Sequence, residues 1–232
     1  MTTLRKASER GHVNWGWLDT YHTFSFSDYF DQDWVHFGTL RVMNEDTIAA
    51  GTGFGMHPHR DMEIITYVLS GGVQHEDSMG NAGVIKAGEV QRMSAGTGIF
   101  HSETNPFAEP LYLYQIWIFP SEKNRTPSYE QKIFSDEAKK NRLLLIASPD
   151  GADGSVTIGQ NAKLFASLID NGTTLHYSRA DTNGGLWLQV VSGTITASGQ
   201  KLGKGDGLAI TEESSLDITA TADAHVLLFD LN

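Results

Sequence analysis

The chain contains no cysteine among its 232 residues. Disulfide bonds and thiolate ligands are therefore excluded, and a metal site would have to be built from His, Asp or Glu. A chain without disulfides is expected in the reducing cytoplasm. The sequence also lacks any apolar run near the roughly 20 residues needed to cross a bilayer. The first residues, MTTLRKASERGHVNWGW, show no apolar segment of a signal peptide. We therefore expect a cytoplasmic protein that does not associate with membranes.

Basic residues are scarce as well. There are 17 Lys and Arg against 28 Asp and Glu, so the formal net charge is −11 and the sequence pI is about 5.2. A surface with this excess of negative charge repels phosphate backbones, and no cluster of Lys and Arg counters it. Direct binding of nucleic acid is not expected.

What the sequence does contain is glycine, 24 residues, between short stretches rich in β-branched and aromatic side chains. Several of these stretches alternate polar with apolar residues, the period of half-buried strands. Helical spacing is weak, and its best candidate is SDEAKKNRLLL, where Ser135 could cap a short helix. The sequence predicts an all-β protein built as a sandwich or barrel from short strands such as residues 22–26, 63–69, 111–119, 186–191 and 225–231.

An internal repeat indicates two copies of one β unit. EIITYVLSGGVQ…VIKAGEV resembles LWLQVVSGTITA…KLGKGDG, and each copy has Ser-Gly between two strands and a later pair of glycine and acid. Two such units predict two packed barrels. The stretch PSEKNRTPSYEQ is the expected connection, which divides the chain into residues 1–122 and 123–232. Because the two halves can pack on each other, we expect a monomer.

The histidines are distributed unequally between the two copies. If they served only to build the fold, both copies should need them, so this asymmetry predicts chemistry in the first half alone. We expect His75 to be a surface or satisfied histidine, and His22 to cover the barrel. The first copy carries His57, His59, His75 and His101, whereas the second carries only His176 and His225, outside the matching positions.

Two segments of the first copy have the spacing of a metal site. Residues two apart on a strand project from the same face, so His57 and His59 form one pair and His101 and Glu103 another. Glu63 lies an even number of residues from His59 and could share its face. Three imidazoles and one carboxylate suit Fe, Ni, Cu, Zn or Mn and leave positions open for water, substrate or dioxygen. Spacing alone does not decide between Glu63 and Glu103 as the carboxylate ligand.

These residues resemble two motifs of the cupin superfamily. The first, G-x5-H-x-H-x3-E, runs from Gly51 to Glu63, and the second runs from Gly88 to Asn105 with Ser94 in place of a proline. The stretches HTFSF, HPH, DSMGN and MSAGTGIFHSE fit the pirin family better than the general pattern. The resemblance covers nearly the whole chain and is closest to bacterial pirin-like proteins with quercetinase activity.

The resemblance implies a bicupin, two jelly-roll barrels packed together, with one divalent metal ion in the N-terminal barrel. It implies His57, His59, His101 and Glu103 as ligands, with Glu63 nearby in a supporting position or on the barrel wall. Fe(II) is the expected ion, and Ni, Cu, Zn, Mn and Co are alternatives.

The implied activity is cleavage of the flavonol quercetin by dioxygen, as in quercetin 2,3-dioxygenase, with Glu103 accepting the proton of the flavonol 3-hydroxyl. Alternatively, the same site would belong to an iron-dependent, redox-sensing regulator that acts through a protein partner. A metal with a merely structural role is disfavoured, because the second copy apparently folds without ligands. The candidate pocket wall consists of Phe24, Phe37, Phe54, Met56 and Met93.

Overall fold

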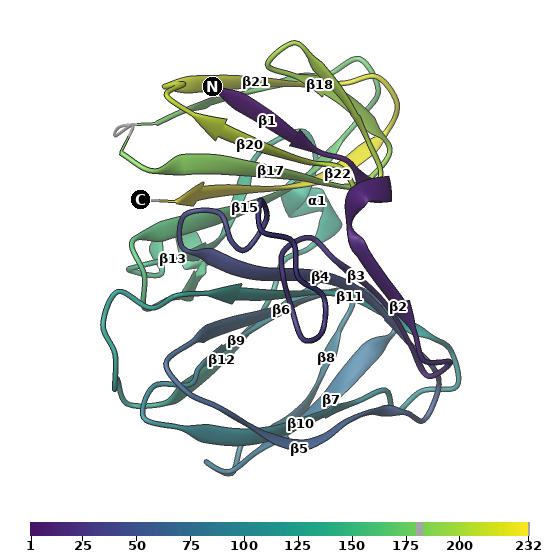
Figure 1. Ribbon diagram of the computed structural model, residues 1–232, viewed down its shortest axis with the longest axis vertical. Helices are drawn as coiled ribbons and strands as arrows, with labels where there is room; N and C mark the ends of the chain where they lie inside the picture. The colour runs from purple at the N-terminus through teal and green to yellow at the C-terminus, as the bar shows by residue number, and fades with distance from the viewer. Residues whose placement is uncertain (180–182, 232) are drawn as a thin grey trace.

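The computed structural model describes residues 1–179 and 183–231, and the regular secondary structure of these residues is almost entirely β-strand. They form two units stacked one above the other, each with a seven-stranded sheet that faces a four-stranded sheet (Figure 1). All strand pairs are antiparallel except β13 with β14. The all-β prediction is confirmed.

In the first unit the larger sheet has the order β12-β9-β6-β11-β4-β3-β2 and the smaller one β5-β10-β7-β8. Its strands are β2 (Gly11–Asn14), β3 (Leu18–His22), β4 (Leu40–Ile48), β5 (Gly53–His59), β6 (Glu63–Ser70), β7 (Gly72–Asp77), β8 (Ala82–Lys86), β9 (Glu89–Ser94), β10 (Ile99–Thr104), β11 (Leu111–Ile118) and β12 (Ser128–Ile133).

In the second unit the larger sheet has the order β1-β20-β17-β22-β15-β13-β14 and the smaller one β16-β21-β18-β19. Its strands are β1 (Thr2–Arg5), β13 (Leu144–Ser148), β14 (Val156–Thr157), β15 (Ala162–Ile169), β16 (Thr174–Ser178), β17 (Gly185–Ser192), β18 (Thr194–Ala197), β19 (Gln200–Gly203), β20 (Gly207–Thr211), β21 (Ser215–Ala220) and β22 (Ala224–Leu231).

Helical structure is confined to single turns, the 3-10 turns η1 (Ala7–Glu9) and η2 (Ala152–Gly154) and the helix α1 (Asp136–Lys139). The hydroxyl of Ser135 accepts a hydrogen bond from the backbone N–H of Ala138 and so caps α1, as its sequence predicts. Among the residues described, no helix is long and apolar enough to span a membrane.

The two larger sheets pack on each other through a shared apolar core. Trp187 of β17 lies at its centre, with ring centroids 5.0 Å from Phe24 and 5.8 Å from Phe37. Strands in this layer are covered on both faces, by the core between the units on one side and by the inside of their own unit on the other. This explains why β17 and β22 are apolar runs rather than strict alternations.

Sheet pairing crosses the expected boundary after residue 122 in both directions. β12 lies beyond that boundary but pairs with β9 in the first unit. β1 lies at the start of the chain but pairs with β20 in the second unit. In each unit, a strand from the other side of the boundary therefore covers one edge of the larger sheet. This pairing satisfies backbone groups that the edge would otherwise expose. No single cut in the chain separates the sheets.

The interiors of the two units differ. The second is filled by one continuous apolar cluster, which includes Leu188, Ile195 and Leu208. The first has two smaller clusters, one around Val73 and Ile85 and the other around Met93 and Ile99. Polar side chains also occupy the inside of the first unit.

Candidate metal centre

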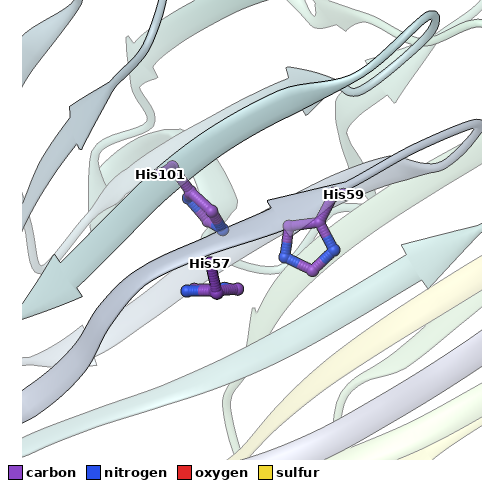
Figure 2. A group of neighbouring side chains, drawn as sticks. All are labelled: His57, His59 and His101. Atoms are coloured by element: carbon purple, nitrogen blue, oxygen red, sulfur yellow. The ribbon is translucent and has the colours of Figure 1, made fainter.

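Antiparallel pairing of β5 with β10 brings the three predicted histidines together. His101 lies opposite His57 in the register, and Ile99 lies opposite His59. Their ring centroids are 4.4 to 4.9 Å apart, and their nearest ligand nitrogens all lie within 4.8 Å of one another. Figure 2 shows the three rings gathered beside the two strands. This histidine triad, His57, His59 and His101, can hold a metal ion.

Hydrogen bonds select the nitrogen that the rings of His57 and His101 leave free. Nδ1 of His57 lies 2.8 Å from the carbonyl oxygen of Gly55 and donates to it, so Nε2 keeps its lone pair. Nδ1 of His101 lies 3.4 Å from Nδ1 of His75. Nε2 of His101 is buried and has no hydrogen-bond partner. A buried nitrogen without a partner is costly unless a ligand or ion completes it, so the triad fits a bound metal.

Burial also keeps His59 and His101 in the protonation state that a metal needs. Burial, together with the neighbouring His57, lowers the pKa of His59 to about 4. Burial, followed by the charges of His57, His59 and His75, lowers the pKa of His101 to about 2. Both rings are therefore neutral at physiological pH, and neutral imidazole is the form that coordinates metals.

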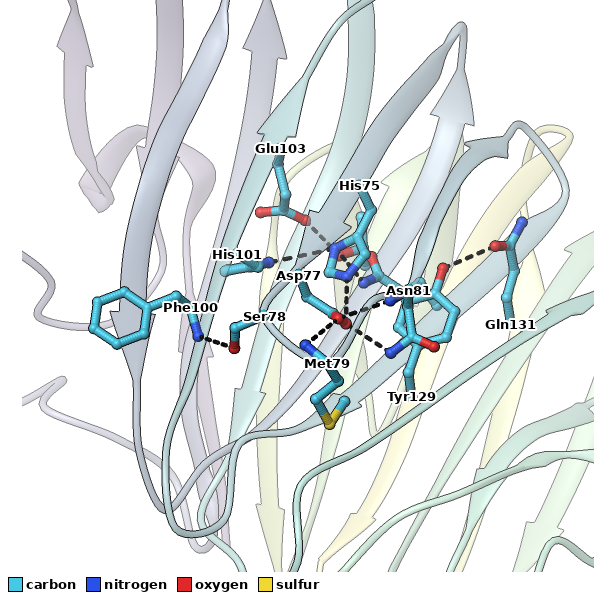
Figure 3. Close-up of polar contacts among 12 residues, drawn as sticks. His75, Asp77, Ser78, Met79, Asn81, Phe100, His101, Glu103, Tyr129 and Gln131 are labelled. Carbon is cyan, nitrogen blue, oxygen red and sulfur yellow. Dashed lines mark hydrogen bonds and ion pairs between the residues drawn. The ribbon is translucent and has the colours of Figure 1, made fainter.

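A chain of contacts behind the triad orients His101 (Figure 3). Nε2 of the fully buried His75 lies 3.1 Å from a carboxylate oxygen of Asp77, so it carries the proton. Nδ1 of His75 is then an acceptor, and it receives the amide of Gln91 at 2.9 Å as well as Nδ1–H of His101. Asp77 is itself held by the side-chain amide of Asn81. From the sequence, a surface or satisfied histidine is expected at position 75. His75 is fully buried and satisfied, and its contact with His101 was not expected.

We predict that Asp77→Asn weakens metal binding by about 10- to 100-fold, the usual effect of removing a partner behind a ligand. The asparagine amide lacks the negative charge that keeps the proton on Nε2 of His75. Without that charge, Nδ1 of His75 is no longer fixed as an acceptor, and His101 loses the contact that orients its ring. Metal affinity measured by competition with a chelator tests this, and excess metal should restore occupancy. The control is Asp217→Asn, which removes the carboxylate partner of the exposed His176 in the second unit. Equal affinity in wild type and Asp77→Asn would contradict the prediction.

Glu103 lies two residues after His101 on β10, and a bulge separates the two residues. Its carboxylate accepts hydrogen bonds from the hydroxyl of Thr66 at 3.1 Å and the amide of Gln115 at 2.8 Å. Burial, which dominates, and the nearby Asp46 raise its pKa to about 7, against these two hydrogen bonds. In the part of the chain described, the group of ligand atoms within 4.8 Å of one another consists of the triad and does not include this carboxylate.

The carboxylate of Glu63 has a different environment. It is buried and accepts a hydrogen bond from the hydroxyl of Ser94 at 2.6 Å. A Cβ placed on Gly159, which belongs to the second half of the chain, would lie 2.7 Å from Glu63 Oε1 and 3.2 Å from Cζ of Arg125. Glu63 therefore contributes to the contact between the two halves of the chain.

A cavity of about 230 Å³ opens beside the triad. Aromatic side chains and Leu18 form one part of its wall, and polar side chains, mostly from β3, β4, β5, β10 and β11, form the rest. It is lined by Trp15, Leu18, Thr20, His22, Phe26, Ser27, Asn44, Asp46, Phe54, His57, His59, Glu103, Gln115 and Trp117. A ring-sized organic ligand could therefore lie against His57 and His59.

Of the five predicted wall residues, only Phe54 lines this cavity. Phe24 and Phe37 pack on Trp187 between the units. Met93 is buried in the cluster around Ile99, and Met56 is 59% exposed on β5. Apolar character in the sequence did not distinguish the cavity wall from ordinary cores, because both require the same side chains.

The polar part of the wall was not predicted from the sequence, apart from the expectation that His22 covers the barrel. It consists of His22, Asn44, Asp46 and Gln115. A signal was present in LRVMNEDTI, the sequence of β4, which places the polar residues Asn44 and Asp46 two residues apart and therefore on the same face of the strand. Burial, opposed by a hydrogen bond from Thr20, raises the pKa of Asp46 to about 7.

Family models match both halves of the chain. The Pirin model matches residues 3–118, and the model described as the quercetinase C-terminal cupin domain matches residues 145–231. Two cupin domains, as the repeat and the motifs predict, are thus confirmed.

Individual relatives match over the full length. Quercetin 2,3-dioxygenase of Escherichia coli K12 is 52% identical over 233 residues, which cover 100% of this chain and 99% of that protein. The crystal structure of the bacterial pirin YhhW from Escherichia coli in complex with nickel(II) is 50% identical, covers 100% of this chain and 99% of its own, and has a TM-score of 0.95. The structure of YhaK from the same organism is 29% identical and covers 95% of this chain and 97% of its own, with a TM-score of 0.77.

Proposed function

The chain belongs to the pirin family, and from this premise we propose that it is a metal-dependent dioxygenase that cleaves flavonols such as quercetin. The observation that carries the proposal is the triad itself, with a buried and unpartnered Nε2 on His101, beside an aromatic-lined cavity that also contains the carboxylate of Glu103. The names of the full-length relatives support the same activity.

We propose that His57, His59 and His101 hold one divalent ion and that Glu103 completes the ligand set. Fe(II) remains the expected ion, and the nickel(II) complex of YhhW supports Ni(II) as an alternative. When bound, the ion would lower the pKa of the flavonol 3-hydroxyl and promote the reaction of the electron-rich ring system with dioxygen.

The residues of the chain bind the substrate and move its proton. Glu103 accepts the proton of the 3-hydroxyl, because its carboxylate lies in the cavity wall. In the metal-free protein burial raises its pKa to about 7, which makes it a stronger base than an exposed glutamate. Thr66 and Gln115 hold the carboxylate in place. Phe54 and Trp117 exclude water and contact the flat rings. The flavonol and one molecule of dioxygen together give a depside and carbon monoxide.

Turnover tests the proposal. Purified protein is stripped of metal, reloaded separately with Fe(II), Ni(II), Cu(II), Zn(II), Mn(II) or Co(II), and given quercetin in air. At least one metal should support loss of the flavonol absorbance with one carbon monoxide released per quercetin consumed, and the stripped protein should not. If the metals bind stoichiometrically and none supports turnover of any flavonol, the proposal fails.

A further inference from the structure

A single row of polar side chains crosses the inner face of the first seven-stranded sheet. The register places His22 beside Asn44, Asn44 beside Gln115, Gln115 beside Thr66, and Thr66 beside Gln91. Neighbouring strands are about 5 Å apart, so the row extends over five strands for roughly 20 Å. Support of the triad and Glu103 alone would not require a polar row of this length.

One half of this polar row donates hydrogen bonds to the facing four-stranded sheet. The amide of Gln91 donates to Nδ1 of His75. Thr66 and Gln115 donate to the two oxygens of Glu103. These contacts bind the two sheets together at the level of the triad.

The other half has unsatisfied atoms. In the chain as described, Nδ1 of His22, Oδ1 of Asn44 and Oδ1 of Asp46, two residues further along β4, are buried and have no hydrogen-bond partner. His22, Asn44 and Asp46 are only 2%, 3% and 4% exposed, and all three line the cavity. A buried polar atom without a partner is unfavourable, because it has lost its hydrogen bonds to water and gained none in the protein. Among the described residues, Nε1 of Trp117 is also buried without a partner, so four such atoms belong to residues that line this cavity. Together they indicate a surface built to be completed by a ligand.

We propose that His22, Asn44 and Asp46 bind free ring hydroxyls of the substrate, at a position one to two strands away from Gln115 and Glu103. This inference rests on the proposed function, which places the 3-hydroxyl and 4-carbonyl end of a flavonol at the triad. Asn44 lies one strand from Gln115 and His22 two strands, about 5 and 10 Å. A ring fused or linked to the reacting ring can span that separation.

The chemistry of the three atoms defines the substrate class. The Oδ1 atoms of Asn44 and Asp46 are acceptors, so the ligand must present donors. Phenolic hydroxyls donate, whereas methoxy groups cannot, and a carboxylate would be repelled by Asp46 and Glu103. The site thus selects polyhydroxylated flavonols with unmethylated rings over the bare 3-hydroxyflavone, which carries the reacting groups alone.

The test compares two ligands on metal-loaded protein, quercetin and 3-hydroxyflavone, in wild type and in Asn44→Leu. Leucine has a similar size and removes the acceptor. Wild type should show a KM for quercetin about tenfold or more below that for 3-hydroxyflavone, and Asn44→Leu should reduce this preference to about threefold or less by raising the quercetin KM. The control is Asn161→Leu, an exposed asparagine of the second half of the chain, which should behave as wild type.

Direct binding separates this inference from the proposed function. Trp15 and Trp117 line the cavity, so ligand binding can be followed by quenching of their fluorescence. Preference for quercetin that is lost in Asn44→Leu supports the hydroxyl site, even if no flavonol is turned over. Turnover with equal KM for both ligands in wild type overturns the hydroxyl site and leaves the dioxygenase standing. If Asn44→Leu does not fold, the binding of ring-methylated quercetin to wild type is measured instead. If the methylated compound binds wild type as tightly as quercetin does, the inference is also overturned.

Discussion

His57→Ala should abolish stoichiometric metal binding and lower flavonol turnover by about a thousandfold or more, while the protein stays folded. Without His57, the proposed ligand set falls to two imidazoles and the carboxylate of Glu103, which lies outside the close group of ligand atoms and whose pKa burial raises to about 7. This remaining set does not hold a divalent ion firmly in an open site. His57 is half-buried and its side chain bonds only to the carbonyl of Gly55, so its truncation leaves no sealed cavity. Metal analysis after dialysis, turnover and thermal unfolding of the metal-free proteins test this prediction.

The matched control is His176→Ala. His176 also lies on a strand and bonds to a carboxylate, Asp217, but it is exposed and belongs to the second unit. Metal content and turnover of this variant should equal those of wild type. A His57→Ala protein that keeps its metal and activity, or one that is unfolded at room temperature, would refute the catalytic role of the triad.

Glu103→Gln should lower kcat by about 100- to 10,000-fold, the typical contribution of a positioned base. Glutamine can keep both hydrogen bonds, since its carbonyl accepts from Gln115 and its amide can donate to Thr66, but it cannot take a proton. The triad remains, so we expect metal to bind with reduced affinity. Turnover at saturating metal separates the loss of the base from the loss of a ligand.

The pH dependence of stability gives a second readout of Glu103→Gln. In metal-free wild type, burial raises the pKa of Glu103 from its ordinary 4.5 to about 7. Its protonated form therefore favours the folded state, and this stability is present below about pH 4.5 and lost as the pH rises through 7. Between pH 5 and pH 8, metal-free wild type should lose on the order of 3 kcal/mol of unfolding free energy that Glu103→Gln keeps. Urea unfolding at the two pH values measures the difference.

Glu63→Gln is the control for both readouts. Glu63 is a buried carboxylate of the same unit, but it bonds to Ser94 and faces the second half of the chain. Its kcat and metal content should remain within about twofold of wild type, as is usual for a substitution away from the reacting groups. If Glu63→Gln loses its metal while Glu103→Gln keeps full activity, the two carboxylates have been assigned the wrong roles.

Local patterns in the sequence were sufficient for the fold class and for the choice of histidines. Alternating polar and apolar residues determine strands, and a spacing of two places His57 and His59 on the same face whatever the strand pairs with. The presence of these histidines in one repeat and their absence from the other located the site in the first half. None of these signals requires contacts between distant residues.

Contacts between distant segments account for what the sequence analysis did not find. The Asp77–His75–His101 chain joins β7 to β10, and the polar row joins His22 of β3 to Asn44 of β4 and on to Gln91 of β9. The pairing of β1 with the second unit and of β12 with the first likewise depends on which sheet edge each strand covers. Register across a sheet is set by packing over the whole fold, which no local pattern records.

The sequence by itself thus determined the β architecture, the two units and the donor atoms available to a metal, because these depend on residue type and on spacing along one strand. Only the tertiary structure places His101 opposite His57 on the neighbouring strand. It also directs Glu103 towards Gln115 and Glu63 towards Ser94. Finally, it leaves Oδ1 of Asn44 without a hydrogen-bond partner in the wall of the cavity. Those outcomes depend on which strands pair and in what register, a balance of burial and hydrogen bonding that exists only once the chain has folded.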